Sequence, residues 1–229
     1  MNLPGFTHDA AGALPLHIVG RLDFATWREA QPAGCVAWLQ AQGFDGSAGT
    51  ALCLPGADGS TAAAMLGVGD GFDPMAYAHA PFALPPRAWR LAGGLDAAAH
   101  AALVLGWGLG SYRFGRYKAA VRTPATLVLE GEAGNAADAL DQVAACARVR
   151  DLVNTPTEHM GPDQLEQVCC EIAERFGAQI EVISGEDLLA RNFPAIHAVG
   201  RASHRAPRLI ALRWGQPQHP HVAIVGKGV

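Results

Sequence analysis

One lysine near the end of the sequence stands where its amine could take part in chemistry. Lys227 lies between Gly226 and Gly228 and follows the apolar run of residues 222–225. Such a run predicts a strand that is buried on both faces of a parallel sheet, and open α/β sheets place their ligands at the carboxyl ends of such strands. Two glycines allow a sharp turn and leave space for a ligand. The pattern therefore predicts that Lys227 belongs to a binding site.

The choice of lysine at this position favours a role for an uncharged amine. Only two of the 17 basic residues are lysines, Lys118 and Lys227, and the others are arginines. Arginine stays protonated in proteins, whereas a buried lysine can lose its proton and offer a neutral amine to a metal ion or a carbonyl group. The alternative is a lone lysine that extends its amine into solvent from a strand end. A phosphate-binding loop is excluded, because position 228 is not Ser or Thr.

Other titratable side chains give weaker signals. The nine histidines show no His-Glu-x-x-His pattern, and a metal role for His219 and His221 is a minor hypothesis. We expect Glu158 and His159 at the surface. A group of basic side chains before residue 209 could bind an anion, but a solvated loop is the preferred interpretation; its members are Arg201, His204, Arg205 and Arg208.

The elements that must position these residues alternate between strands and helices, which predicts an α/β fold. Strands are expected at residues 14–19, 50–54, 62–68, 89–92, 125–130, 179–183, 208–214 and 222–225. Helices are expected at residues 23–30, 34–42, 74–79, 96–109, 135–153, 162–176, 184–189 and 193–199. Asp23, Asp96 and Asn135 are expected to cap the helices that they begin. Pro162 is expected at the first position of its helix, and Gly177 is expected to end that helix. Residues 1–13 are expected to be frayed or loosely packed.

Two further features have a structural and a functional interpretation. The Gly-x-Gly-x-Gly loop from Gly67 to Gly71 could hold an anion with its backbone amides, but ordinary turn glycines are preferred. An aromatic group beside Arg113 could stack nucleotide bases, but we expect it to close a core. Its members are Trp107, Tyr112, Phe114 and Tyr117.

Composition argues against several classes of protein. Half of the residues are apolar, which indicates a globular protein with a sizeable core. A net charge of −4 without a dense basic cluster argues against nucleic-acid binding, and we disfavour DNA as a partner. No apolar run is long enough for a membrane span, and the first residues do not resemble a secretion signal. Five cysteines without C-x-x-C spacing indicate neither disulfides nor a zinc knuckle, and most are expected to be buried.

Three stretches resemble the leucyl aminopeptidase family, the two-metal cytosolic aminopeptidases of peptidase family M17. Residues 225–229 resemble the opening of the family signature Val-Gly-Lys-Gly-(Ile/Val)-(Thr/Cys)-Phe-Asp-(Ser/Thr)-Gly-Gly. Residues 150–156, Arg-Asp-Leu-Val-Asn-Thr-Pro, together with residues 160–162, Met-Gly-Pro, resemble the hinge between the family's domains. Residues 106–114 resemble the Gly-x-x-Leu-x-x-Tyr-x-Phe segment of its N-terminal domain.

The resemblance implies an N-terminal macro-like α/β domain with a mixed central sheet at residues 1–134. A linker helix at residues 135–154 and an incomplete start of the catalytic domain at residues 155–229 would follow. The implied activity is release of N-terminal amino acids from peptides by a cytoplasmic homo-hexamer. It would use two divalent ions, Mn or Zn, with Lys227 as a neutral-amine ligand of one of them.

The resemblance also sets limits. The sequence stops before the Asp and Gly-Gly of the signature, so we expect no catalytic residue in this chain, no stably bound metal and little peptidase activity. The strand that ends at Lys227 should then lack a neighbour on at least one edge. The alternative function is a non-catalytic macro-like module for ligand binding or oligomer assembly, with the loop from Gly67 to Gly71 as its candidate ligand site.

Overall fold

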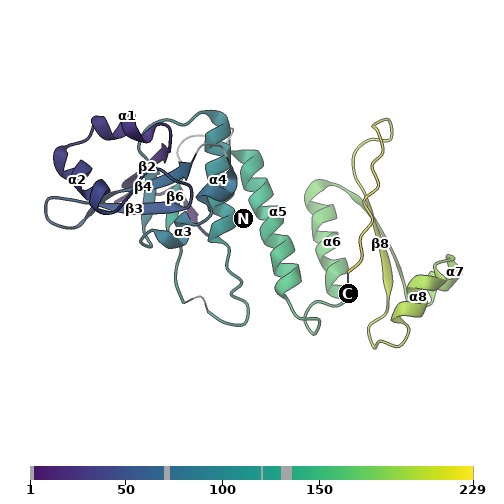
Figure 1. Ribbon diagram of the computed structural model, residues 1–229. Helices are drawn as coiled ribbons and strands as arrows, with labels where there is room; N and C mark the ends of the chain where they lie inside the picture. The colour runs from purple at the N-terminus through teal and green to yellow at the C-terminus, as the bar shows by residue number, and fades with distance from the viewer. Residues whose placement is uncertain (1–2, 70–72, 120, 130–135, 229) are drawn as a thin grey trace. The chain divides into compact units, whose positions relative to one another are not determined.

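The chain folds into two compact units, Met1–Asp151 and Leu152–Val229 (Figure 1). The computed structural model describes residues 3–69, 73–119, 121–129 and 136–228. Among these described residues, no helix is both long and apolar enough to cross a lipid bilayer. The domain boundaries expected at residues 134 and 154 stay a prediction.

A six-stranded mixed sheet forms the centre of the first unit, in the order β1-β6-β5-β2-β4-β3. Neighbouring strands are parallel except β3 and β4, which are antiparallel. This arrangement confirms the predicted α/β class with a mixed central sheet. The strands are β1 (Phe6–Thr7), β2 (Leu14–Gly20), β3 (Thr50–Pro55), β4 (Thr61–Gly69), β5 (Ala88–Leu91) and β6 (Thr126–Val128).

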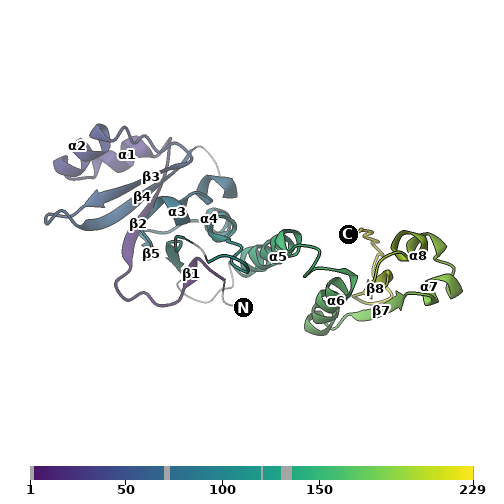
Figure 2. The ribbon, with the colours of Figure 1, turned by 90° about the horizontal axis from the view of Figure 1, so that it is seen from below.

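Helices cover both faces of this sheet (Figure 2). On one face lie α1 (Phe24–Glu29) and α2 (Ala33–Ala41); on the other lie the 3-10 helix η1 (Pro74–Tyr77), α3 (Ala80–Ala83) and α4 (Ala97–Ser111). The long helix α5 (Ala137–Asn154) packs against α4 through a small apolar cluster. The cap expected at Asn135 lies outside the described residues.

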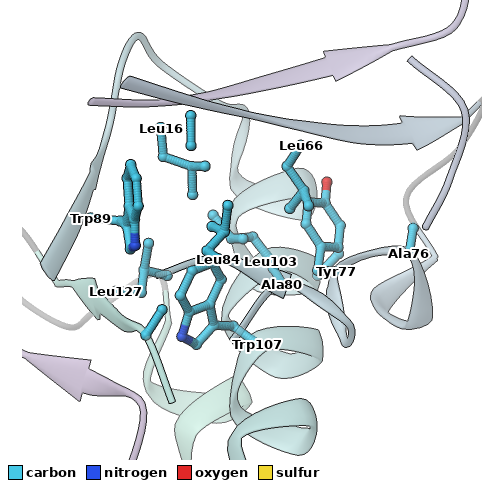
Figure 3. Close-up of a cluster of buried hydrophobic side chains, with 13 residues drawn as sticks. Leu16, Leu66, Ala76, Tyr77, Ala80, Leu84, Trp89, Leu103, Trp107 and Leu127 are labelled. Carbon is cyan, nitrogen blue, oxygen red and sulfur yellow. The ribbon is translucent and has the colours of Figure 1, made fainter. Parts of the chain in front are cut away.

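The alternation of side chains along β2 explains why the sheet has two cores. Leu16 is fully buried in the cluster on the α4 side, where Trp107 of α4 is also fully buried (Figure 3). Val19 faces the opposite cluster, which α1 and α2 cover. The indole N–H of Trp107 donates to the carbonyl of Gly5 at 2.9 Å, so this buried polar group has a partner. Both faces therefore carry apolar layers, as a sheet between helices requires.

Helix α4 is held at its start by a cap and along its length by glycines. The Asp96 carboxylate accepts a hydrogen bond from the Ala99 N–H at 2.8 Å, which confirms the predicted cap. A Cβ at Gly106 would lie 1.9 Å from the Pro74 carbonyl oxygen, and one at Gly108 would lie 2.5 Å from Val143 of α5. These glycines therefore let two neighbouring elements approach α4 closely.

Strand β1 was not predicted. Phe6 pairs with Leu127 and Thr7 with Val128, so the segment expected to be loosely packed forms an edge of the sheet. Strand β1 has only two residues, which is too few to show the alternation of apolar and polar side chains that indicates a strand. Its partners lie about 120 residues further along the chain.

Two smaller expectations are wrong. None of the five cysteines is fully buried, and Cys146 and Cys170 are exposed. Asp23 precedes α1 as expected, but its side chain forms no capping hydrogen bond, because the helix is short and the residue itself has helical dihedral angles. Cys169 is half-buried, and Cys170 beside it is exposed.

The second unit contains a two-stranded sheet with the long helix α6 packed on it and two short helices, α7 and α8. Its elements are α6 (Pro162–Phe176), β7 (Gln179–Ser184), α7 (Asp187–Ala190), α8 (Pro194–Gly200) and β8 (Arg208–Arg213). The predicted ends of α6 are confirmed, because Pro162 begins it and Gly177 ends it with a φ of 64°. Strands β7 and β8 pair antiparallel with each other. Among the described residues, the second sheet consists of these two strands.

The predicted buried strand at residues 222–225 is wrong for this chain. These residues are irregular, and Val222, Ile224 and Val225 are 84%, 94% and 94% exposed. The sequence pattern requires a neighbouring strand and a cover on both faces, and the described part of the second unit provides neither.

Candidate functional site

Lys227, the predicted ligand, is an exposed residue in an irregular segment. The space beside Gly226 is open, since a Cβ added there would meet no atom within 4 Å. A Cβ at Gly228 would lie 2.7 Å from Leu165 of α6, so the main chain packs closely on that helix. The open space at Gly226 agrees with the expected room for a ligand, but the described residues show no sharp turn here. The burial that would favour a neutral amine is missing from the described contacts.

The described residues do not fit a metal centre. They contain no group of three or more His, Cys, Asp or Glu side chains that could hold an ion. His219 and His221 are exposed, and the ring of His221 contacts the Pro217 carbonyl at 3.2 Å. Two-metal sites need several protein ligands in a fixed geometry. Lys227 is therefore an isolated candidate ligand, and no step through a metal is assigned to this chain's residues.

Two members of the basic group before β8, Arg205 and Arg208, form structural contacts. Arg205 donates to the carbonyl of Thr157 at 2.5 Å and to that of Glu158 at 2.7 Å. It thereby fixes the loop between α5 and α6. Glu158 and His159 themselves are exposed, as predicted. The expectation of a solvated loop is therefore wrong for Arg205.

Arg208 from the same group forms an ion pair with Glu166 of α6. The side chains are 15% and 29% exposed, so water screens this pair less than a surface pair. The pair joins the start of β8 to the first half of α6. Arg201 and His204 are exposed, so a local anion site would have to use these two side chains.

Two stretches that resembled family segments meet in the first unit. Arg150 of α5 donates to the Leu109 carbonyl at 2.7 Å, and its guanidinium carbon lies 5.2 Å from the centre of the Tyr112 ring. The Tyr112 hydroxyl donates to Asp151 at 2.8 Å. The end of α4 is therefore fastened to the end of α5. Sequence spacing gave no sign of this junction.

The aromatic group divides between core and surface. Trp107 is fully buried, which confirms the expected core role, but Tyr117 is 49% exposed. Its ring meets that of Phe114 at a centroid distance of 5.7 Å. Arg113 stacks on Phe82, with its guanidinium carbon 3.6 Å from the ring centre. The expectation of a closed core is therefore wrong for the exposed end of the group.

The described glycines of the Gly-x-Gly-x-Gly loop have structural roles. A Cβ at Gly67 would lie 2.2 Å from the Thr50 hydroxyl, and Gly69 has a φ of 70° and donates to the Gly46 carbonyl at 2.9 Å. Both glycines lie in β4 rather than in a turn, so the preferred interpretation is right in giving them a structural role but wrong in placing them in a turn. Asp70 and Gly71 lie outside the described residues.

A hollow of about 420 Å³ lies beside the end of β4. Its described lining is Ala48, Gly49, Val68, Gly69, Asp73, Met75 and Ala76. Asp73 is the only charged side chain in that lining, and its carboxylate accepts a hydrogen bond from the Met75 N–H at 2.8 Å. Because the described lining offers no cation to a phosphate, the hollow does not favour a nucleotide ligand. The macro-like binding module stays an alternative prediction.

Comparison with known proteins gives two family matches in series. The description "M17 aminopeptidase, N-terminal domain" matches residues 14–130, and "Cytosol aminopeptidase family, catalytic domain" matches residues 147–229. A probable cytosol aminopeptidase of Rhodococcus opacus is 30% identical over 88% of this chain, and the match covers 44% of that protein. Another from Corynebacterium efficiens is 37% identical over 56% of this chain and 27% of its own length.

Comparison with solved structures also finds a cytosol aminopeptidase that matches most of this chain. A crystal structure of cytosol aminopeptidase from Coxiella burnetii matches 91% of this chain at 32% identity, with a TM-score of 0.79. The bottromycin maturation enzyme BotP, solved in complex with Mn, matches 91% of the chain at 26% identity and a TM-score of 0.71. The matches cover 45% and 46% of those two chains. The chain thus spans less than half the length of these relatives.

Proposed function

The chain belongs to the M17 family of cytosol aminopeptidases, and on that premise we propose that it supplies the N-terminal domain and the first part of the catalytic domain of a metallo-aminopeptidase. The observation that carries the proposal is the order of the two matches along one chain: the first ends at residue 130, before α5, and the second begins at residue 147, within α5. The substrates would be peptides with a free N-terminus. A cytoplasmic location agrees with the names of the relatives.

Lys227 is the residue of this chain to which we assign a part in metal binding. Lys227 is exposed, and the main chain at Gly228 packs against Leu165 of α6, so the amine is accessible beside a helix. Binding of Mn by BotP supports a divalent ion as the cofactor, with Zn as the other candidate. The homo-hexamer implied by the family resemblance stays a prediction.

The described residues alone lack the ligands for such a site, so we assign them a structural part in the activity. The hydrogen bonds of Arg205 fix the loop that follows α5, and the pair between Arg208 and Glu166 fixes β8 on α6. These contacts hold the base from which the segment containing Lys227 extends. Hydrolysis itself would need carboxylate ligands in addition to this amine.

A chimera tests the assignment directly. Residues 1–229 would replace the matching segment of the Coxiella burnetii cytosol aminopeptidase, whose fold agrees over 91% of this chain. We expect the chimera to release leucine from a leucine anilide when Mn²⁺ or Zn²⁺ is added. Lys227→Arg should abolish turnover and weaken metal binding in calorimetry, because guanidinium cannot act as a neutral ligand.

Lys118→Arg is the matched control, because it changes the only other lysine of the chain at an exposed position. Circular dichroism of both variants separates loss of a ligand from loss of the fold. A Lys227→Arg chimera with full activity and unchanged metal affinity would refute the assignment. The 229-residue chain by itself should show no turnover with either ion, and robust turnover would refute the expectation that its ligand set is insufficient.

A further inference from the structure

We propose that the loop between α4 and β6 binds an acidic segment of a partner protein. The residues that carry the proposal are 113–119 and 121–122, which we call the basic loop. This inference does not depend on the proposed aminopeptidase function. It concerns the first unit alone, and it names the partner by its chemistry, a short stretch of carboxylate side chains.

Positive charge is concentrated in the basic loop. Its four cationic side chains are Arg113, Arg116, Lys118 and Arg122, and residues 97–129 contain no Asp or Glu. The whole chain has a net charge of −4, so the chain without these four cations has a net charge of −8. The basic loop therefore forms a local positive region on an acidic protein, and such a region attracts and orients negatively charged partners.

No carboxylate among the described residues forms an ion pair with the basic loop. The cations of the ion pairs in the described part of the chain are Arg21, Arg191, His197, Arg208 and Arg213. Arg116 and Lys118 of the basic loop are exposed. The carboxylates of a partner would therefore not compete with carboxylates of the described chain for these two cations.

Two contacts attach the ends of the basic loop to the region of α3. The Arg113 guanidinium carbon lies 3.6 Å from the centre of the Phe82 ring, and Phe82 belongs to α3. Arg122 donates to the carbonyl of Leu84, the residue that follows α3, at 3.0 Å. Between these ends, the loop extends beyond α3 and α4 at the lower edge of the first unit (Figure 1). A loop that is fixed at both ends loses less freedom when a partner binds.

The aromatic side chains favour an acidic peptide over nucleic acid. Tyr117 is 49% exposed, and its ring centre lies 5.7 Å from that of Phe114 and 5.6 Å from the Arg116 guanidinium carbon. Proteins that bind single-stranded nucleic acid stack successive bases on several aromatic side chains along a basic groove. Tyr117 is the only exposed aromatic side chain in the described part of the basic loop. The negative charge of the rest of the chain also opposes a long strand of phosphates, whereas a short acidic segment needs only the loop itself.

Fluorescence anisotropy with the 229-residue chain tests the proposal, with a fluorescein-labelled oligoglutamate as the probe. We expect saturable binding that weakens as salt is added. Lys118→Glu should raise the Kd by at least about tenfold, because an attraction becomes a repulsion. Arg201→Glu is the matched control, since it makes the same change of charge at an exposed position of the second unit and should keep the wild-type affinity. Thermal unfolding checks that both variants fold.

A carbodiimide cross-link gives a second readout, because this reagent joins a carboxylate to a nearby amine. The chain has two lysines, Lys118 and Lys227, and both are exposed. We expect mass spectrometry to find the oligoglutamate on Lys118 in preference to Lys227.

The proposal is overturned by an oligoglutamate that does not bind, by equal effects of the two glutamate variants, or by equal cross-linking of the two lysines. It is also overturned if an oligothymidylate of the same charge binds more tightly than the oligoglutamate, since that result would identify the loop as a nucleic-acid surface.

Discussion

Replacement of Gly106 by alanine tests the packing of α4 most directly. A new Cβ would lie 1.9 Å from the Pro74 carbonyl oxygen, 2.8 Å from the Pro74 carbonyl carbon and 3.0 Å from the Tyr77 Cβ. Ordinary contact begins at 3.4 Å, so η1 would have to move by roughly 1.5 Å. None of these atoms lies at the end of a flexible side chain. The strain cannot be relieved by rotation of a side chain alone.

The expected magnitude follows from two opposing effects. Alanine is favoured over glycine inside a helix by about 0.5–1 kcal/mol. Overpacking of a dense core costs about 1–3 kcal/mol, and a contact this short belongs at the upper end of that range. We therefore expect Gly106→Ala to lower the free energy of unfolding by about 2 kcal/mol. For a chain of this size, the melting temperature should fall by roughly 4–8 °C.

Gly34→Ala is the matched control for this substitution. Gly34 lies inside α2, has no positive φ, and offers open space to an added Cβ, which would meet no atom within 4 Å. Only the helix-propensity effect remains there, and Gly34 lies in the first turn of α2, so the same change should raise stability by at most about 0.5–1 kcal/mol. Chemical denaturation followed by tryptophan emission reports on the first unit, because Trp89 and Trp107 are fully buried in it. Equal shifts of the same sign in the two variants would refute the packing argument.

Three other experiments on substituted chains should give measurable results. Asp96→Ala removes the cap of α4 and should lower the free energy of unfolding by about 1 kcal/mol. Asp96→Asn should retain most of the stabilisation that the cap provides, because an Asn side chain can accept the same hydrogen bond. Burial lowers the pKa of His17, so its contribution to stability should be complete above about pH 6.5, the unfolded value, and be lost as the pH falls through the lower folded value. His17→Leu should reduce the dependence of stability on pH. Unfolding at each pH can be followed by the fluorescence of Trp27, because the centre of its ring lies 5.4 Å from that of His17. A double-mutant cycle of Glu166→Gln and Arg208→Met should give a coupling of about 1–3 kcal/mol, and strict additivity would contradict the partly buried ion pair.

Local signals in the sequence were sufficient for most helices. Asp96 and Gly177 mark helix ends through their own chemistry, a capping carboxylate and a left-handed backbone, and both act as predicted. The apolar period of α6 also depends on neighbours a few residues apart. Such features need no knowledge of the rest of the fold, so they can be predicted from the sequence.

Features that depend on distant partners were predicted less well. The segment at residues 222–225 has the composition of a buried strand, but composition cannot state whether a neighbouring strand is present. Likewise, the hydrogen bonds of Arg205 to the loop after α5 join residues 48 and 47 positions apart. For the candidate site, the sequence identified Lys227 by its flanking glycines, and that assignment stays a proposal because the described residues provide no companion ligands.

Strand β1 imposes an order of events on the protein as it leaves the ribosome. Phe6 is made about 120 residues before its partner Leu127. At translation rates of about 5–20 residues per second, the interval is roughly 6–24 s. During that time the nascent N-terminus has no site to join. The edge of the sheet can therefore be completed only after nearly the whole first unit has been synthesised.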